Sequence, residues 1–184
     1  GLVNVATLPN ISSDEKSKIP EYIRESANKM DQLVKDLSII LTARSTINYK
    51  KESVSVSQII KSNEALLESQ IIESNTIIKT DILSSNDKIV TIRSYLESIL
   101  YNLISNAIKY KSPERTPEIL ISTKKENGTF ILTVADNGIG IDLERHGNQV
   151  FGLYKRFNFD VEGKGLGLHM TKTQVEALGG KICV

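Results

Sequence analysis

The sequence has little of several residue types on which whole classes of protein depend. One cysteine, Cys183, excludes an internal disulfide framework and fits a reducing compartment. Two histidines beside that cysteine are too few for a typical zinc site of histidine and cysteine ligands. The 23 basic and 22 acidic residues nearly cancel, so the charge does not favour nucleic acid as a partner. No apolar run approaches membrane-spanning length and no signal peptide is visible, so we expect no direct membrane contact by this region.

What the sequence does have is enough apolar content for a folded core. Its 184 residues, 40% of them hydrophobic, fit one large domain or two small ones. The opening stretch "GLVNVATL" is typical of the end of a helix, and the closing stretch "GGKICV" of the first half of a hairpin. We therefore expect the sequence to be a piece of a longer protein.

A long helix is predicted over residues 12–47, where Ser12 and Glu15 form a capping box. Its apolar residues alternate spacings of four and three, as in a heptad seam: Ile23, Ala27, Met30, Val34, Leu37 and Leu41. The seam favours a helical hairpin or dimeric bundle, and the alternative is a helix packed on its own domain. The pattern changes near residues 48–52, which predicts two domains, 1–48 and 49–184.

The second domain is predicted to mix helices and strands. Strands are expected at 53–57, 75–82 and 88–92, with two more around the hairpin signal Asn127-Gly128 within 118–136. Helices are expected at 57–72, opened by Ser57, at 94–111, and at 167–178, ended by Gly179-Gly180. This order predicts an α+β fold.

The helix at 94–111 carries amides beside its apolar face. The apolar stripe consists of Leu96, Ile99, Leu100, Leu103 and Ala107. Asn102, Asn106 and Lys109 fall on a neighbouring line, four and three residues apart, so they project together. Asparagine disfavours a helix interior, whereas amide oxygens bind hard cations and lysine pairs with phosphate. The line therefore suits a metal–polyphosphate, and the alternative is two tolerated surface amides.

Two glycine-rich loops add to this pattern. In the first, a predicted strand ends at Asp136, whose carboxylate can accept from an amine, and Gly138 and Gly140 let the backbone approach a ligand. In the second, "EGKGLGLHM" (162–170), glycines precede a helix whose first amides can bind an anion.

The segment between the two loops, "VFGLYKRFNFDVE" (150–162), is called the connector below. Its aromatic residues, Phe151, Tyr154 and Phe157, are predicted to pin it to the domain. Lys155 and Arg156 would then reach a terminal phosphate as the connector folds down. The alternative is a surface loop whose aromatic residues merely reach the core.

Four motifs in one order carry a family resemblance: "NLISNAIKY" (102–110), "DNGIGI" (136–141), "FGLYKR" (151–156) and "GKGLGL" (163–168). As an ordered set they resemble the N box, first glycine box, F box and second glycine box of the nucleotide-binding domain of sensor histidine kinases. The resemblance covers about residues 52–184. The helix at 12–47 resembles the second helix of that family's dimerisation and phosphoacceptor hairpin.

The resemblance implies a two-layer α/β sandwich, the Bergerat ATP-binding fold, that uses ATP and Mg²⁺. It implies transfer of the γ-phosphoryl group to a histidine, for relay to a response-regulator receiver domain in a two-component system. The implied setting is a homodimer joined through the helical hairpin, with this region in the cytoplasm whether the parent protein is membrane-anchored or soluble.

The resemblance also implies residue roles. Asn106 would hold Mg²⁺, Asn102 and Lys109 would support the phosphates, and Tyr110 would line the nucleotide site. Asp136 would accept from the adenine amino group, and Arg156, with Asn102, would serve the transferring phosphoryl group. The other implied nucleotide-binding residues are Gly138, Gly140, Ile141, Phe151, Lys155, Gly163, Gly165, Leu166, Gly167 and Leu168.

One departure limits the chemistry expected of the chain. The family's phosphate-accepting histidine lies on the first hairpin helix, whereas the two histidines here are His146 and His169, both interpreted as structural or exposed. We therefore expect ATP binding without self-phosphorylation.

Three rival functions share the same ATP-binding fold. Gyrase, MutL and Hsp90-type ATPases carry a glutamate as general base where Asn102 stands, and an amide cannot deprotonate water. Anti-sigma serine kinases are a closer rival, but the heptad helix directly upstream favours the histidine-kinase layout. A non-catalytic docking module is disfavoured by the intact Asp136, Asn106 and glycines, for which a module without ATP has no physical need.

Overall fold

The computed structural model of the protein describes residue 20, residue 23, residues 50–158 and residues 165–184. The chain divides into two units, Gly1–Ser45 and Thr46–Val184, and the fold below is that of the second. The predicted helix at 12–47 and its hairpin interpretation lie outside the described residues, apart from Pro20 and Ile23. They stay predictions, as does the domain boundary near residues 48–52.

The second unit contains both strands and helices. The strands are β1 (Glu52–Ser55), β2 (Ile77–Ile82), β3 (Lys88–Thr91), β4 (Glu118–Glu126) and β5 (Thr129–Asp136). The helices are α3 (Val56–Leu66), α4 (Glu68–Ser74), α5 (Arg93–Lys109), α6 (Leu143–His146) and α7 (Gly167–Ala177), with short 3₁₀ turns η1 (Ser84–Asn86) and η2 (Gly147–Gln149).

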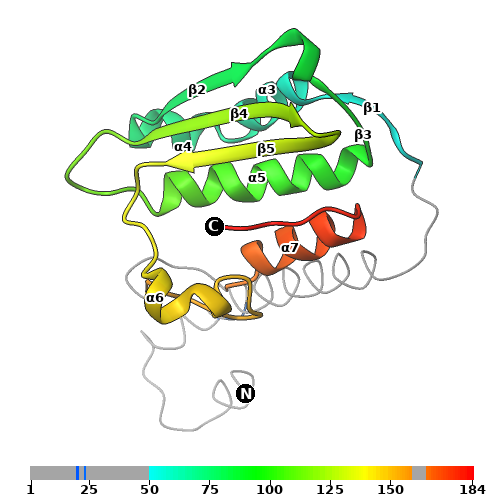
Figure 1. The fold of residues 1–184 in the computed structure, drawn as a ribbon. Helices are drawn as coiled ribbons and strands as arrows, with labels where there is room; N and C mark the ends of the chain where they lie inside the picture. The colour runs from blue at the N-terminus through cyan, green and yellow to red at the C-terminus, as the bar shows by residue number, and fades with distance from the viewer. Residues whose placement is uncertain (1–19, 21–22, 24–49, 159–164) are drawn as a thin grey trace, which may run out of the picture. The chain divides into compact units, whose positions relative to one another are not determined.

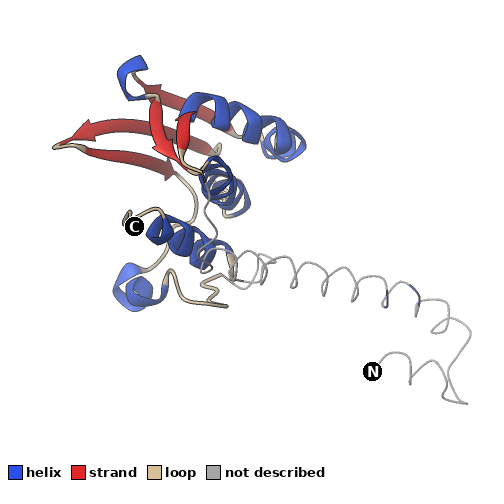
Figure 2. Cartoon of the chain, turned by 90° about the vertical axis from the view of Figure 1, so that its right-hand side faces the viewer, coloured by secondary structure: helices blue, strands red, loops and turns tan. Residues whose placement is uncertain are grey.

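The strands form a three-stranded sheet and a separate ribbon. β2 pairs in parallel with β4, and β4 pairs antiparallel with β5. β1 and β3 form a two-stranded antiparallel ribbon. Helix α5 runs along one face of the three-stranded sheet, and α7 lies on the far side of α5 from that sheet (Figures 1 and 2). The predicted α+β fold, with helices layered on a sheet, is confirmed.

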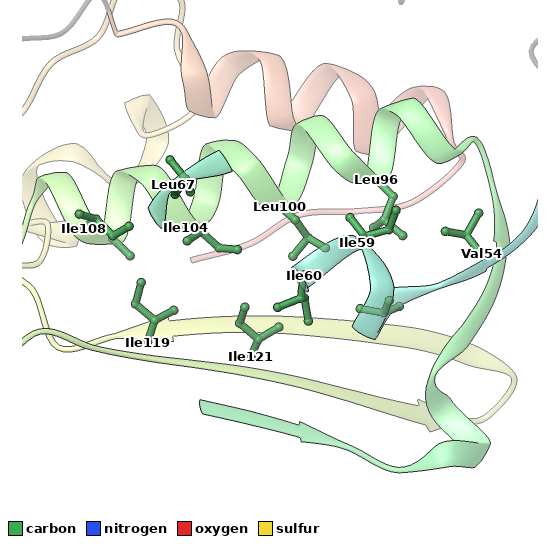
Figure 3. Packing of buried hydrophobic residues seen from close by; sticks show 12 residues of the cluster. Val54, Ile59, Ile60, Leu67, Leu96, Leu100, Ile104, Ile108, Ile119 and Ile121 are labelled. Atoms are coloured by element: carbon green, nitrogen blue, oxygen red, sulfur yellow. The ribbon is translucent and has the colours of Figure 1, made fainter. Parts of the chain in front are cut away.

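The hydrophobic core lies between the sheet and α5. Ile119 and Ile121, alternate residues of β4, face Leu100 and Ile104 of α5 across this layer (Figure 3). Side chains alternate across a strand, so Ile119 and Ile121 lie on one face of β4. They repeat every three to four residues on a helix, so Leu100 and Ile104 lie on one face of α5. None of the four is more than 1% exposed, so each contributes about 1.5–3 kcal/mol of hydrophobic stabilisation.

The buried face of α5 is wider than the sequence predicted. Leu103, placed on the apolar stripe, is only partly buried, whereas the unpredicted Ile104 and Ile108 are 0% and 6% exposed. The cause is that α5 packs on two sides, against the sheet and α3 and against α7.

The start of α3 also differs from the prediction. Ser55, not Ser57, is the N-cap, and its hydroxyl oxygen accepts from the backbone N–H of Gln58 at 3.2 Å. Ser57 instead donates its hydroxyl to Asp87 at 2.6 Å. The strand predicted at 53–57 therefore ends at Ser55, and Leu67 divides the helix predicted at 57–72 into α3 and α4.

Asp87 fastens η1 to the beginning of α3. Its carboxylate accepts from the hydroxyl of Ser55 at 2.7 Å and from the backbone N–H of Ser57 at 2.8 Å, in addition to the Ser57 hydroxyl. Burial acts to raise the pKa of Asp87, but the hydrogen bonds from Ser57 and Ser55 and the charge of Lys88 outweigh it. The pKa of this carboxyl therefore lies below its usual value.

The hairpin turn and the C-terminal stretch were also predicted from the sequence. The hairpin at Asn127-Gly128 is confirmed, with φ of 50° and 78° at the two residues, as a tight turn between antiparallel strands requires. Residues 180–184 form no strand, so the half-hairpin predicted there is not observed.

Within the described ranges, no helix combines the length and apolar character needed to span a membrane.

Candidate functional site

Two asparagine side chains on α5 meet the first residue of α7. A Cβ placed on Gly167 would lie 3.6 Å from the Oδ1 of Asn102 and 3.6 Å from the Nδ2 of Asn106. Both asparagines are partly buried, which fits their place between two packed helices. The fold thus brings together two predicted site segments that lie more than fifty residues apart in the sequence.

A polar cleft opens beside Asn106 where the last turns of α4 and α5 meet. Its volume is about 480 Å³, and its lining residues are Gln70, Glu73, Ser74, Ser105, Asn106, Ile108, Lys109 and Lys111. Lys109 brings a positive charge to this lining, and its ammonium also lies 5.4 Å from the centre of the Tyr110 ring. Asn106 and Lys109 therefore share one solvent-open cleft, as their spacing predicted.

The loop after β5 is fastened to the end of α5. The backbone N–H of Ile139 donates to the carbonyl of Tyr110 at 3.0 Å. A Cβ on Gly138 would lie 2.5 Å from that same oxygen, so no larger residue fits without movement. The small size of Gly138 thus has a structural cause, in addition to the ligand approach predicted from the sequence.

Asp136 stands at the end of β5 with its side chain exposed. Its Oδ1 accepts from the backbone N–H of Gly138 at 2.8 Å, which sets the start of the loop. Within the described part of the chain, its Oδ2 accepts no hydrogen bond. The carboxylate therefore keeps one oxygen available for an external donor.

Asn137 is a structural residue of this loop that was not predicted from the sequence. Its Oδ1 accepts from the backbone N–H of Glu118 at 2.9 Å, and its Nδ2 donates to the carbonyl of Thr116 at 2.9 Å. These bonds hold the segment entering β4 against the segment leaving β5. Its position directly after a strand-ending aspartate was the available signal, because asparagine side chains readily bond nearby backbone.

The described part of the connector, residues 150–158, is held at several points. The carbonyl of Phe151 lies 3.0 Å from the Nδ1 of His169 on α7. Gly165 adopts φ of +67°, and a Cβ there would overlap the backbone of Lys155. The ring of Phe157 lies 5.0 Å from that of His146.

The prediction that Tyr154 pins the connector is wrong. Its side chain is 59% exposed, so the ring is not buried against the domain, and its φ of 59° lies in the left-handed region that few residues other than glycine adopt. Phe151 and Phe157 are partly buried, in agreement with the prediction for those two rings.

The other predicted site residues lie in varied surroundings. Lys155 is exposed and Arg156 is partly buried. Leu166 is only 7% exposed, so its side chain belongs to the interior. Those left are the exposed Gly140, the partly buried Ile141 and Leu168, and Gly163, which lies outside the described residues.

Two kinds of sequence comparison give consistent matches. The family model described as "Histidine kinase-, DNA gyrase B-, and HSP90-like ATPase" matches residues 91–184. The methanogenesis regulatory histidine kinase FilI of Methanothrix harundinacea is 31% identical over 162 residues, which are 88% of this chain and 18% of that protein. The histidine protein kinase SaeS of Staphylococcus aureus is 29% identical over 167 residues, which are 89% of this chain and 48% of that protein. The chain thus spans less than half the length of these curated relatives.

Solved structures share the fold. The Acinetobacter baumannii histidine kinase AdeS superposes with a TM-score of 0.71 at 19% identity, over 97% of this chain and 81% of that one. Full-length ShkA in complex with AMPPNP superposes with a TM-score of 0.72 at 22% identity, over 97% of this chain and 38% of that one. At sequence identities this low, the superpositions show a shared fold and do not by themselves show a shared function.

Proposed function

The chain belongs to the family of histidine kinase-, DNA gyrase B- and HSP90-like ATPases, and we propose that it is the catalytic, ATP-binding region of a sensor histidine kinase. In this role it transfers the γ-phosphoryl group of ATP to a histidine on a helical hairpin. A response-regulator receiver domain then takes the phosphoryl group onto an aspartate.

The observation that carries the proposal is the meeting of Asn102 and Asn106 with Gly167. The amides at a helix start bind anions, and α7 presents its start to two side-chain amides. Amide oxygens are also ligands for hard cations such as Mg²⁺. Donors for phosphate and a ligand for its counter-ion therefore lie side by side, as Mg·ATP requires.

Each residue around this point has a defined task in the proposal. Bound Mg²⁺ supplies positive charge that offsets the charge of the phosphates. Asn106 holds that ion through its amide oxygen, while Asn102 and Lys109 orient the phosphate oxygens. Arg156 stabilises negative charge on the transferring phosphoryl group, a role worth about 10³ or more in rate when an arginine serves it.

Asp136 gives the site its selectivity for adenine. The Oδ2 oxygen accepts from the exocyclic amine of adenine, while Oδ1 remains bonded to the N–H of Gly138. Guanine would turn a carbonyl oxygen toward the same carboxylate, and two acceptors repel. A polar mismatch of this kind can discriminate by roughly 10⁴-fold.

The phosphoryl acceptor is proposed to lie outside residues 1–184. The two histidines of the sequence are His146, in α6, and His169, in α7, and neither is on a helix of the hairpin type. The acceptor is then the histidine of a hairpin helix in a homodimer. The cytoplasm, which holds ATP and the response regulator, is the compartment we propose for this region.

Isothermal titration calorimetry with Mg·ATP tests the binding step. The parent chain should give a saturable heat, and Asn106→Ala should weaken the affinity by about tenfold or more, because one ligand of the ion is lost. Ser94→Ala, an exposed change on the first turn of the same helix, is the matched control and should bind as the parent does. No heat from the parent at millimolar nucleotide would contradict the proposal.

Transfer of label tests the chemistry and separates the kinase from a docking module or an ATPase. With labelled ATP the chain alone should stay unlabelled, and an added hairpin protein carrying the acceptor histidine should become labelled. Label on His146 or His169 would overturn the assignment of the acceptor. Steady release of phosphate without transfer would favour a hydrolase.

A further inference from the structure

Both histidines of the sequence contact the connector. The Nδ1 of His169 lies 3.0 Å from the carbonyl oxygen of Phe151, and the ring of His146 lies against that of Phe157. His169 is the third residue of α7, and its ring therefore joins the first turn of that helix to the beginning of the connector. Neither contact has a part in the roles derived above.

The chemistry of the His169 contact fixes the state of its ring. A carbonyl oxygen has no proton to give, so Nδ1 must be the donor in this hydrogen bond. The neutral ring is then the Nδ1–H tautomer, with its other nitrogen, Nε2, without a proton. Because the partner is a backbone carbonyl, the bond positions the main chain of the connector rather than one mobile side chain.

The position of this contact gives it a consequence for the site. Lys155 and Arg156 follow Phe151 by four and five residues. Gly165 packs on the backbone of Lys155, and Gly167 faces Asn102 and Asn106. The stretch 165–169 therefore touches the connector at both Phe151 and Lys155, and touches the asparagine helix between these two contacts.

We propose that His169 is a positioning residue that, by donating its Nδ1–H to the carbonyl of Phe151, sets the cationic part of the connector relative to the first turn of α7. The expected effect on ATP binding rests on the proposed function, in which Lys155 and Arg156 are held beside the phosphates of ATP. The positioning itself does not depend on nucleotide.

A pair of variants tests this role. His169→Asn keeps a donor, since the Nδ2 of asparagine is attached at the same point of the side chain as Nδ1 of histidine, whereas His169→Leu removes it. In the leucine variant, hydrogen exchange of the backbone amides at 152–157, without nucleotide, should be about five- to tenfold faster. This factor corresponds to the net free energy of one lost hydrogen bond. The asparagine variant should exchange as the parent does, and affinity for Mg·ATP should follow the same order.

The parent protein supplies a test that needs no variant. Long-range ¹⁵N–¹H spectra in mildly alkaline solution, where imidazole is neutral, should show His169 with its proton on Nδ1. A proton on Nε2 would overturn the proposal, as would equal exchange rates in the leucine variant and the parent. If the parent binds no ATP, the proposed function fails, and the exchange rates and the tautomer still decide the role of His169.

Discussion

Replacement of Gly167 by alanine separates a binding role of this residue from a structural one. The added methyl would lie 3.6 Å from Asn102 Oδ1 and 3.6 Å from Asn106 Nδ2, which is ordinary van der Waals distance, so the helices need not move apart. Gly167 is in helical conformation at the first position of α7, where alanine is preferred to glycine. The fold should therefore be unchanged or more stable by up to about 0.5–1 kcal/mol.

Nucleotide binding should respond in the opposite direction. The added methyl would cover the polar groups of Asn102, Asn106 and the start of α7 that bound phosphate oxygens would otherwise contact. Loss of one such bond to a charged group costs about 1.5–3 kcal/mol, which corresponds to about 10- to 100-fold in affinity for Mg·ATP. Calorimetry for binding and thermal unfolding for stability, on the same samples, give the two quantities.

The matched control is Gly147→Ala, whose added methyl has no neighbour within 4 Å among the residues that the structure describes. It should leave the affinity for Mg·ATP as it is in the parent. If Gly167→Ala retains the parent's affinity and folds normally, the phosphates do not bind beside Asn102, Asn106 and the start of α7, and the proposed binding mode is wrong.

Three further changes test other parts of the structure. Asp136→Asn keeps an oxygen that can accept from the N–H of Gly138, so the fold should survive, but calorimetry should show about tenfold weaker ATP binding because the charged acceptor is lost. An unchanged affinity would contradict the base-reading role. Gly138→Ala sets a methyl 2.5 Å from the carbonyl of Tyr110, and chemical denaturation should show a loss of about 1–3 kcal/mol; parent-like stability would mean that the loop can yield. Asp87→Asn should also destabilise, by about 1–2 kcal/mol near neutral pH, because the bonds from Ser57 and Ser55 weaken. Because the pKa of Asp87 is lower in the folded protein, its carboxylate stabilises the fold above the unfolded pKa of about 3.9, and this stabilisation is lost as the pH falls through the folded pKa. If the parent stayed more stable than Asp87→Asn at a pH below both pKa values, the charge of Asp87 would not be the cause.

Local sequence pattern predicted the parts of the fold that local physics decides. The Asn127-Gly128 turn and β5 follow from turn chemistry and a run of β-formers, and α5 follows from its apolar spacing. The start of α3 could not be read in the same way, because Ser55 and Ser57 are equally good caps by composition. Asp87, thirty residues further along, engages Ser57 and leaves Ser55 as the cap.

The candidate site shows the same division. The line of Asn102, Asn106 and Lys109 was predictable from helical periodicity alone. That Gly167 would face the first two residues was not, because no local rule relates α5 to α7. Tyr154 was misplaced for a related reason: no local pattern says which aromatic residues of a loop are buried, and the ring of Tyr154 is exposed in the structure.

The most direct test of the account is a crystal structure of the chain with Mg²⁺ and a non-hydrolysable ATP analogue. The account predicts the adenine amine on the carboxylate of Asp136, the metal on the amide oxygen of Asn106, and the phosphates beside Asn102 and the start of α7. A base bound away from Asp136, or phosphates that approach neither asparagine, would contradict it.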